Sequence, residues 1–316
     1  MTSNKTESGA NLWKPNRQTN KLVEQLVRWI CSAFAFISIL TTIGIILSLV
    51  FETIEFFIEL HQMEGKQIWD FFFEGKWTPL FQSQEFGISV LISATIMTSG
   101  IAILVALPIG LLAAIYLSEY ASSNVRKVVK PVLEILAGIP SVVFGYFALL
   151  FVTPLLRSIF PFIGPFNALS AGLVLGIFIT PLIASLSEDA IYSVPQSVRD
   201  GAYALGATKR ETILSVLLPA ALSGIVASVI LGASRAIGET MVVTLAAGQN
   251  PRLGLNPFVS VQTMTSYIVQ VSLGDTPAGT IEFKTLFAVG MTLFVITLSL
   301  NIFSFWFVRR FREEYE

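Results

Sequence analysis

Six long runs of apolar residues, separated by polar segments, dominate the sequence. They cover Trp29–Phe51, Phe86–Leu117, Pro131–Leu156, Leu169–Leu186, Leu222–Ala247 and Phe283–Val308. A helix needs roughly 20 apolar residues to cross the hydrocarbon core of a bilayer, and each run is about that long or longer. The second run contains Pro108, which predicts a kink or a tilt there. The pattern therefore predicts an all-α integral membrane protein with six transmembrane helices.

The basic residues lie mostly on one side of this six-span arrangement. The polar segments before the first span, after the second, after the fourth and after the sixth hold Lys5, Lys14, Arg17, Lys21, Arg28, Arg126, Lys127, Lys130, Arg199, Lys209, Arg210, Arg309, Arg310 and Arg312. The opposite side holds Lys66, Lys76, Arg157, Arg252 and Lys284. Cytoplasmic segments are enriched in Lys and Arg, so we expect both termini in the cytoplasm. We also expect residues 1–28 to form a cytoplasmic tail and residues 29–316 a single transmembrane domain.

The segment from residue 52 to residue 85 stands out on the outer side, because it is long, acidic and rich in aromatic residues. Its aromatic residues include Trp69, Trp77 and the run Phe71–Phe73. This mixture is typical of an amphipathic piece lying at the membrane–water boundary. A solvated loop is an equal alternative for its first half.

Composition supports the membrane assignment and excludes several site types. The 316 residues are 53% hydrophobic and only 13% charged, with a mean hydropathy of +0.72, whereas soluble domains are about a quarter charged. With one cysteine (Cys31) and one histidine (His61), an internal disulfide, a cysteine or histidine metal centre and a histidine-based triad are implausible. We expect no metal, no cofactor and no nucleic-acid partner for this chain.

The segment of residues 187–219, between the fourth and fifth spans, has a recognisable spacing. Its helical pattern is broken by Pro195, turns at Gly206 and resumes until Pro219. The small residues Ala202 and Ala204 would let a partner surface approach closely. The sequence Asp-Gly-Ala at 200–202, then Gly206, nine residues, and Val-Leu-Leu-Pro at 216–219 resembles the EAA loop of ABC importer permeases.

That resemblance implies a type I permease fold in which this loop forms a coupling helix against a separate ATPase subunit. The residues to which it assigns this role are Asp200, Gly201, Ala202, Gly206 and Ala207. The sequence departs from the pattern with Asp for Glu, Gly for the first Ala and Val for Ile. Because the sequence has no G-x-x-x-x-G-K-[ST] phosphate loop, we expect no enzymatic activity in this chain, and ATP hydrolysis in a partner.

The fifth span carries two charges within its apolar run, Arg235 and Glu239. An arginine at mid-bilayer costs about 2.5–3.5 kcal/mol on insertion scales, so such residues face a bundle interior or a watery cavity. Spacing of four residues on one helix predicts that Glu239 lies one turn from Arg235 on the same face. Two interpretations remain open: a structural salt bridge, or an anion-recognising arginine that Glu239 holds in place.

A row of small residues follows a neighbouring face of the same helix at a spacing of four: Ser228, Gly232, Ala236 and Thr240. Rows of this kind let membrane helices pack closely. The row therefore predicts that the fifth span packs tightly against a neighbouring span.

Two segments make the resemblance more specific. The sequence from Leu231 to Val243, LGASRAIGETMVV, is similar to a segment of the phosphate permeases of Pst-type ABC importers, and Leu136–Phe151 resembles their third span. The outer insertion and the third span look more like PstC than PstA. The resemblance implies an inner-membrane permease for inorganic phosphate that pairs with a PstA-like permease, a PstB-like ATPase dimer and a PstS-like binding protein. It also implies a substrate pathway that includes Arg235 and Glu239, to which we add Ser141 and Thr240.

Three alternatives stay open on physical grounds. Charge alone does not separate phosphate from other tetrahedral oxyanions such as sulfate or molybdate. A membrane-embedded enzyme or sensor with a structural Arg–Glu pair, and an uncoupled anion channel, are the others. The spans lack a second ionisable cluster for acid–base chemistry, and the EAA-like loop has no purpose in a channel.

Overall fold

The computed structural model describes residues 17–63 and 65–311. It divides into two compact units, residues 1–51 and 52–316. Helix α1 (Arg17–Gln62) begins in the first unit and ends in the second. The predicted tail of residues 1–28 is thus helical from Arg17 onward, and its first 16 residues lie outside the described part of the chain.

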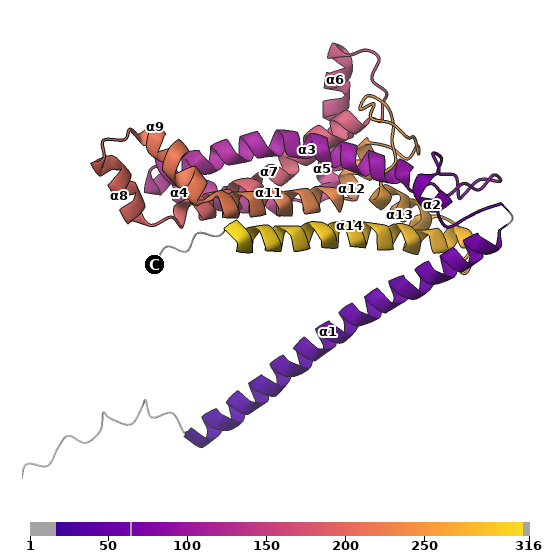
Figure 1. The fold of residues 1–316 in the computed structure, drawn as a ribbon, viewed down its shortest axis with the longest axis horizontal. Coiled ribbons are helices and arrows are strands. Elements are labelled where there is room, and N and C mark those ends of the chain that lie inside the picture. Colours follow the sequence, from indigo (N-terminus) through magenta and orange to yellow (C-terminus); the bar gives the residue numbers. More distant parts are fainter. Residues whose placement is uncertain (1–16, 64, 312–316) are drawn as a thin grey trace, which may run out of the picture. The chain divides into compact units, whose positions relative to one another are not determined.

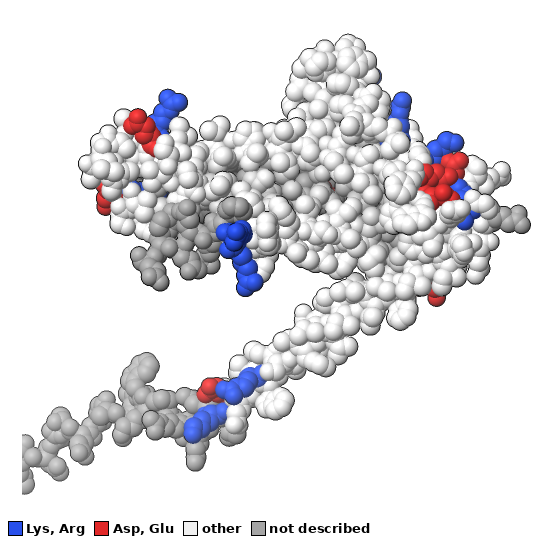
Figure 2. Space-filling view, in the orientation of Figure 1, with Lys and Arg blue, Asp and Glu red and all other residues white. Residues whose placement is uncertain are grey.

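The second unit is built from helices throughout (Figure 1). Its order is α2 (Asp70–Phe73), α3 (Ser89–Ile115), the π-helical turn η1 (Tyr116–Tyr120), α4 (Ser123–Ala137), α5 (Ser141–Phe147), η2 (Ala148–Val152), α6 (Thr153–Ile159) and α7 (Ala168–Tyr192). There follow α8 (Gln196–Ala204), α9 (Lys209–Thr212), η3 (Ile213–Leu217), α10 (Leu218–Ala220), α11 (Leu222–Ile237), α12 (Met241–Ala246), α13 (Met264–Leu273) and α14 (Ile281–Phe311). In Figure 2 the charged side chains of this unit gather over α8 and α9, at the C-terminal end of α14 and near α2, and the surface between these groups is almost free of charge.

Five helical segments of the described chain are long and apolar enough to cross a membrane: Val23–Gln62, Ser89–Tyr120, Ser141–Ile159, Ala168–Tyr192 and Ile281–Arg310. A sixth span arises if Lys209–Ala220 and Leu222–Ile237, which meet at an angle of 69°, count as one bent span. The predicted all-helical architecture is therefore confirmed, with two of the predicted spans revised.

The third span is shorter than predicted. Residues from Pro131 to Ala137 belong to α4, a separate amphipathic helix. The helical conformation is interrupted at residues 138–140, before α5 begins at Ser141. Pro140 has an extended ψ of 133° and lacks an N–H, so it ends α4 and begins α5 rather than kinking a continuous helix. Ser122 caps the start of α4 by accepting the N–H of Val125.

The fifth span is also interrupted. Helix α11 ends at Ile237, and α12 begins at Met241 after a break at residues 238–240. The predicted run Leu222–Ala247 is therefore two helices, and it carries the charged residues at their junction.

The outer segment of residues 52–85 differs from the solvated-loop alternative, and its place at the membrane–water boundary stays a prediction. Its first part continues α1, so it is not a loop, and Phe56 is fully buried. Phe71, Trp77 and Phe86 join the same apolar cluster, which includes Tyr267 of α13. Trp77 and Phe86 also form an antiparallel bridge. These rings pack inside the protein, and other aromatic side chains of the segment, such as Trp69 and Phe73, are exposed.

The main core lies between α3, α7, α11 and α12, and small residues let these helices approach closely. Ser228, Gly232 and Ala236 are the buried face of α11, as predicted, and Ser228 shares a hydrogen bond of 2.7 Å with Ser187 of α7. Thr240, the fourth member of the predicted row, falls outside α11.

The tight packing of α7 against α3 at Gly172 yields a testable prediction. A Cβ atom at Gly172 would lie 2.7 Å from Cβ of Ile101 and 3.1 Å from the Thr98 carbonyl, whereas one at Gly100 would meet nothing within 4 Å. Gly172→Ala should lower the free energy of unfolding by about 1–3 kcal/mol through overpacking. Gly100→Ala should be neutral or stabilising by up to about 1 kcal/mol, because alanine favours helix. The midpoint of unfolding in sodium dodecyl sulfate measures both, and equal midpoints would contradict the packing.

Candidate functional site

The break between α11 and α12 positions the two charged residues of the fifth span. Gly238 ends α11, and its N–H bonds to the carbonyl of Ser234 at 3.1 Å. Arg235 therefore lies in the last turn of α11, and Glu239 lies beyond the end of that helix. The prediction that both residues share one helix face is wrong, since the helix that would align them ends between them.

The Arg235 guanidinium lies over an aromatic ring. Its central carbon is 4.7 Å from the ring centroid of Phe178 in α7, and Phe178 packs in turn against Phe144 of α5 at 5.0 Å. A cation gains from the negative face of an aromatic ring and from the negative C-terminal end of a helix. Arg235 is exposed in this single chain, so its charged group lies at the surface beside the ring of Phe178.

Glu239 has a different role from the predicted one. One of its carboxylate oxygens, Oε1, accepts the backbone N–H groups of Met241 at 3.1 Å and Val242 at 3.4 Å. Its carbonyl accepts the hydroxyl of Thr265 in α13 at 2.6 Å. Glu239 thus supplies acceptors for the free N–H groups at the start of α12.

The expected salt bridge between Arg235 and Glu239 does not form. In the described part of the chain, no carboxylate lies within ion-pair distance of Arg235. The first N–H groups of α12 compete with Arg235 for the Glu239 carboxylate, because unpaired backbone N–H groups inside a membrane protein are costly. The result is a guanidinium that has no carboxylate partner among residues 17–63 and 65–311.

The other two residues of the predicted pathway flank this break from different helices. Thr240 is half-buried at the start of α12, and its hydroxyl donates to the Gly238 carbonyl at 3.3 Å. Ser141 is the half-buried first residue of α5. Helices α5 and α12 touch at Gly145, where an added Cβ would lie 3.0 Å from the Met241 carbonyl. Arg235, Glu239 and Thr240 therefore lie around one junction, and Ser141 begins the helix packed beside it.

The segment that resembles a coupling loop has the predicted conformation. Helix α8 ends at Ala204, Gly206 turns the chain at φ +84°, and Thr208 and Glu211 form a reciprocal cap at the start of α9. These hydrogen bonds from Thr208 lower the pKa of the Glu211 carboxyl below its usual value.

The surface of this loop differs from expectation at one alanine. Asp200, Gly201 and Leu205 are exposed, with Leu205 at 91%, whereas Ala207 is half-buried. Ala202 is only 8% exposed, so its small size serves packing within its own chain rather than the approach of a partner.

Sequence reasoning missed a buried ion pair beneath this loop. An Arg199 terminal nitrogen lies 3.1 Å from Glu119 Oε1, and the two side chains are 10% and 7% exposed. Arg199 also donates to the carbonyls of Ile191, at 2.9 Å, and Val194. Glu119 belongs to η1, so the pair joins α8 to the end of α3. From the sequence, Arg199 served only as one of the basic residues that indicate which side of the membrane is cytoplasmic.

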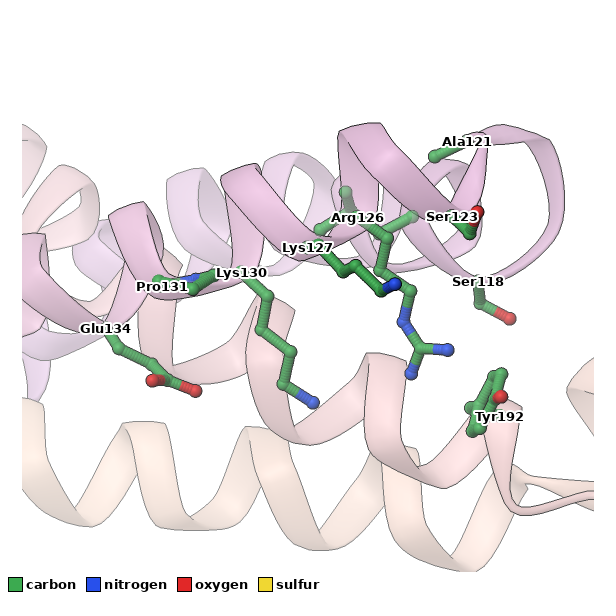
Figure 3. A pocket seen from close by; sticks show the side chains of 10 residues that line it. Ser118, Ala121, Ser123, Arg126, Lys127, Lys130, Pro131, Glu134 and Tyr192 are labelled. Carbon is green, nitrogen blue, oxygen red and sulfur yellow. The ribbon is translucent and has the colours of Figure 1, made fainter.

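A second ionic cluster joins α4 to α7. The Glu188 side chain is 1% exposed and lies within ion-pair distance of Arg126 and of Lys130, whose Nζ is 2.9 Å away. Lys130 also contacts Asp189, and the Arg126 guanidinium lies 3.6 Å from the Tyr192 ring centroid. Partial burial disfavours the charged lysine, but hydrogen bonds to Asp189 and Glu188 outweigh it and raise the pKa of Lys130. A cavity of about 550 Å³ opens beside this cluster, and Arg126, Lys127 and Lys130 point into it from α4 (Figure 3).

The buried pair can be tested by removing one charge. Glu119→Gln leaves Arg199 largely buried without a counter-charge, so we expect the free energy of unfolding to fall by about 3 kcal/mol. Glu134→Gln removes an exposed carboxylate of α4 and should change it by less than about 0.5 kcal/mol. Detergent unfolding measures both, and an unchanged midpoint for Glu119→Gln would show that the pair contributes nothing to stability.

Comparison with known proteins identifies the family. Residues 106–313 match the family described as binding-protein-dependent transport system inner membrane component. Two similar relatives are the probable ABC transporter permease protein YqgH of Bacillus subtilis (35% identical, covering 89% of this chain and 90% of the relative) and the phosphate transport system permease protein PstC of Haemophilus influenzae (33%, covering 89% and 92%). The probable PstC of Methanocaldococcus jannaschii is 32% identical and covers 72% and 77%.

Solved structures agree on the fold. The chain superposes on a permease chain of a bacterial ABC transporter that imports alginate, with a TM-score of 0.57, 18% identity and coverage of 93% of this chain and 100% of that one. The MetNI methionine ABC transporter matches with a TM-score of 0.52, 19% identity and coverage of 72% and 95%. The expected ABC importer permease fold is therefore confirmed, and so is the resemblance to PstC. The chain belongs to the binding-protein-dependent transport system inner membrane components, the membrane-embedded permease subunits of ABC importers.

Proposed function

We propose that this chain is the PstC-like permease subunit of an ATP-driven phosphate importer, and that it forms half of the anion pathway. The observation that carries the proposal is Arg235, a guanidinium at a helix break with no carboxylate partner in the described chain. Several relatives that cover most of the chain bear the name of phosphate transport permeases, which supports phosphate as the anion.

Arginine suits a transient phosphate contact. Its planar fork makes paired hydrogen bonds to phosphate oxygens, and it stays charged at any relevant pH. Contact with Phe178 replaces a fixed carboxylate, so an anion need not displace a strong ion pair to bind. A single charge also holds the anion weakly enough for release, which a transport pathway requires. Thr240 and Ser141 supply hydroxyl groups near the same junction.

The transporter also needs partners that this chain does not contain. ABC importer permeases work with an ATPase and a substrate-binding protein, and in our proposal these are PstB-like and PstS-like subunits together with a PstA-like sister permease. Helix α8 and the Gly206 turn would receive the motion of the ATPase. The basic residues near α4, α8 and α9 favour the cytoplasm for that end, and hence for both termini.

A related oxyanion such as sulfate or molybdate is the second candidate, because its charge and shape would satisfy Arg235 equally well. The name of YqgH specifies no substrate, so the relatives do not all point to phosphate. Membership of a permease family weighs against an enzyme, a sensor or an uncoupled channel.

Uptake into vesicles tests the function directly. The complete transporter, reconstituted with ATPase, sister permease and binding protein, should take up radiolabelled phosphate on ATP addition, and excess sulfate should not compete. Arg235→Gln should reduce this uptake by at least about 100-fold, because a transition-state charge contact is worth roughly 3 kcal/mol. Assembly with the ATPase should be unchanged.

Arg157→Gln is the matched control, since Arg157 is an exposed arginine of α6 away from the helix break. It should keep normal uptake. Unimpaired uptake by Arg235→Gln would remove Arg235 from the pathway, and full competition by sulfate would favour the second candidate.

The coupling role depends on the backbone at Gly206. Its φ of +84° is strained for a β-branched residue and tolerated by asparagine. Gly206→Val should therefore reduce co-purification of the ATPase severalfold, and Gly206→Asn should preserve it. Membrane insertion of both variants should be normal. Equal ATPase binding by the two would mean that the turn does not shape the docking surface.

A further inference from the structure

The cavity beside α4 lies apart from the helix break and has no role in the function proposed above. Its volume is about 550 Å³, and its lining includes Ser118 of η1, Ser123 of α4 and Tyr192 of α7. Figure 3 shows the side chains of Arg126, Lys127 and Lys130 descending from α4 into this space, with Glu134 at the opposite end from Ser118, Ser123 and Tyr192.

The charges around the cavity are unevenly distributed. Arg126 and Lys130 share the two carboxylates of Glu188 and Asp189, so these four charges cancel. Lys127 is exposed and, within the described residues, has no carboxylate partner. Glu134 is the one carboxylate in the cavity lining and brings the overall charge close to zero. It lies at the opposite end from Ser118, Ser123 and Tyr192, so the end with these hydroxyl groups has only cationic side chains nearby, those of Arg126 and Lys127.

The outer face of α4 indicates where the cavity lies. The residues of α4 that point away from the basic side are aliphatic and exposed, with Val128 at 65% and Ile135 at 71%. A helix that is apolar outside and basic inside is typical of the lipid–water boundary, where lysine and arginine reach for head groups. The cavity therefore opens beside the inner surface of the bilayer, a location that rests on the orientation in the proposed function.

We propose that this cavity binds a phosphate group on the cytoplasmic side, separate from the transport pathway, with Lys127 and Arg126 as its charged contacts. Arginine and lysine are the usual partners of phosphate oxygens. The Ser123 and Tyr192 hydroxyls add further donors, whereas the Ser118 hydroxyl already donates to Glu119. The group is carried by an acidic phospholipid or is free inorganic phosphate.

Reactivity of Lys127 toward an amine-acylating reagent tests the site without transport. The full chain would be placed in nanodiscs of phosphatidylcholine alone, of phosphatidylcholine with added inorganic phosphate, or of phosphatidylcholine and phosphatidylglycerol in equal parts. Peptide mass spectrometry then gives the acylation rate of Lys127. Occupancy of the cavity should slow that rate severalfold relative to Lys209 and Lys21, which lie outside it and report general effects of surface charge.

Protection by phosphatidylglycerol alone identifies the lipid, and protection by inorganic phosphate identifies the free anion; either supports the site. Equal acylation in all three conditions overturns it. Because no substrate moves and no ATPase is present, failure here is distinct from failure of phosphate uptake.

A matched pair of variants checks that the cavity itself is responsible. Ser123→Asp introduces a carboxylate into the cavity in the first turn of α4, a position that favours acidic residues in a helix. It should abolish the ligand-dependent protection of Lys127. Asn124→Asp adds the same charge at the neighbouring exposed position, which does not line the cavity, and should leave the protection intact. Loss in both variants, or in neither, would contradict the site.

Discussion

The need to satisfy backbone polar groups inside a membrane governs this structure. Lipid offers no hydrogen bonds, so a break in a spanning helix persists only where protein groups supply them. At the end of α11 the Gly238 N–H bonds to Ser234, and Thr265 donates to the Glu239 carbonyl. The Glu239 carboxylate accepts two N–H groups of α12. Because this carboxylate bonds to the backbone, no carboxylate in the described part of the chain pairs with Arg235, and the availability of its charge follows from the helix break.

The opposite end of the bundle handles its charges differently. Arg199 is paired with Glu119, and Glu188 with two cations of α4, so the charges most deeply buried there are compensated. Removing one partner of such a pair is costly, which makes the connections stiff. The loop after α7 is thus joined to α3, and α4 to α7. Such connections suit the coupling role that we propose for this surface.

The two unpaired cations of this account, Arg235 and Lys127, occupy contrasting settings. Arg235 rests on an aromatic ring among α5, α7 and α11. Lys127 extends from a helix whose other face is aliphatic and exposed. In both proposals the placement of charges around the cation, rather than the number of basic residues, favours the approach of an anion.

Sequence alone determined the number and approximate position of the spans, because contact with lipid selects apolar residues one position at a time. It also determined the helix–turn–helix of the coupling loop, since Pro195, Gly206 and Thr208 act on their immediate neighbours. The tertiary structure decided what depended on distant partners. Ala202 is buried by its own chain, and Arg199 meets a carboxylate 80 residues away. The break at Gly238 is held by Thr265, which lies 26 residues beyond Glu239. The hydrophobic pattern predicts one continuous helix through Gly238, because the groups that stabilise the break are not neighbours in the sequence.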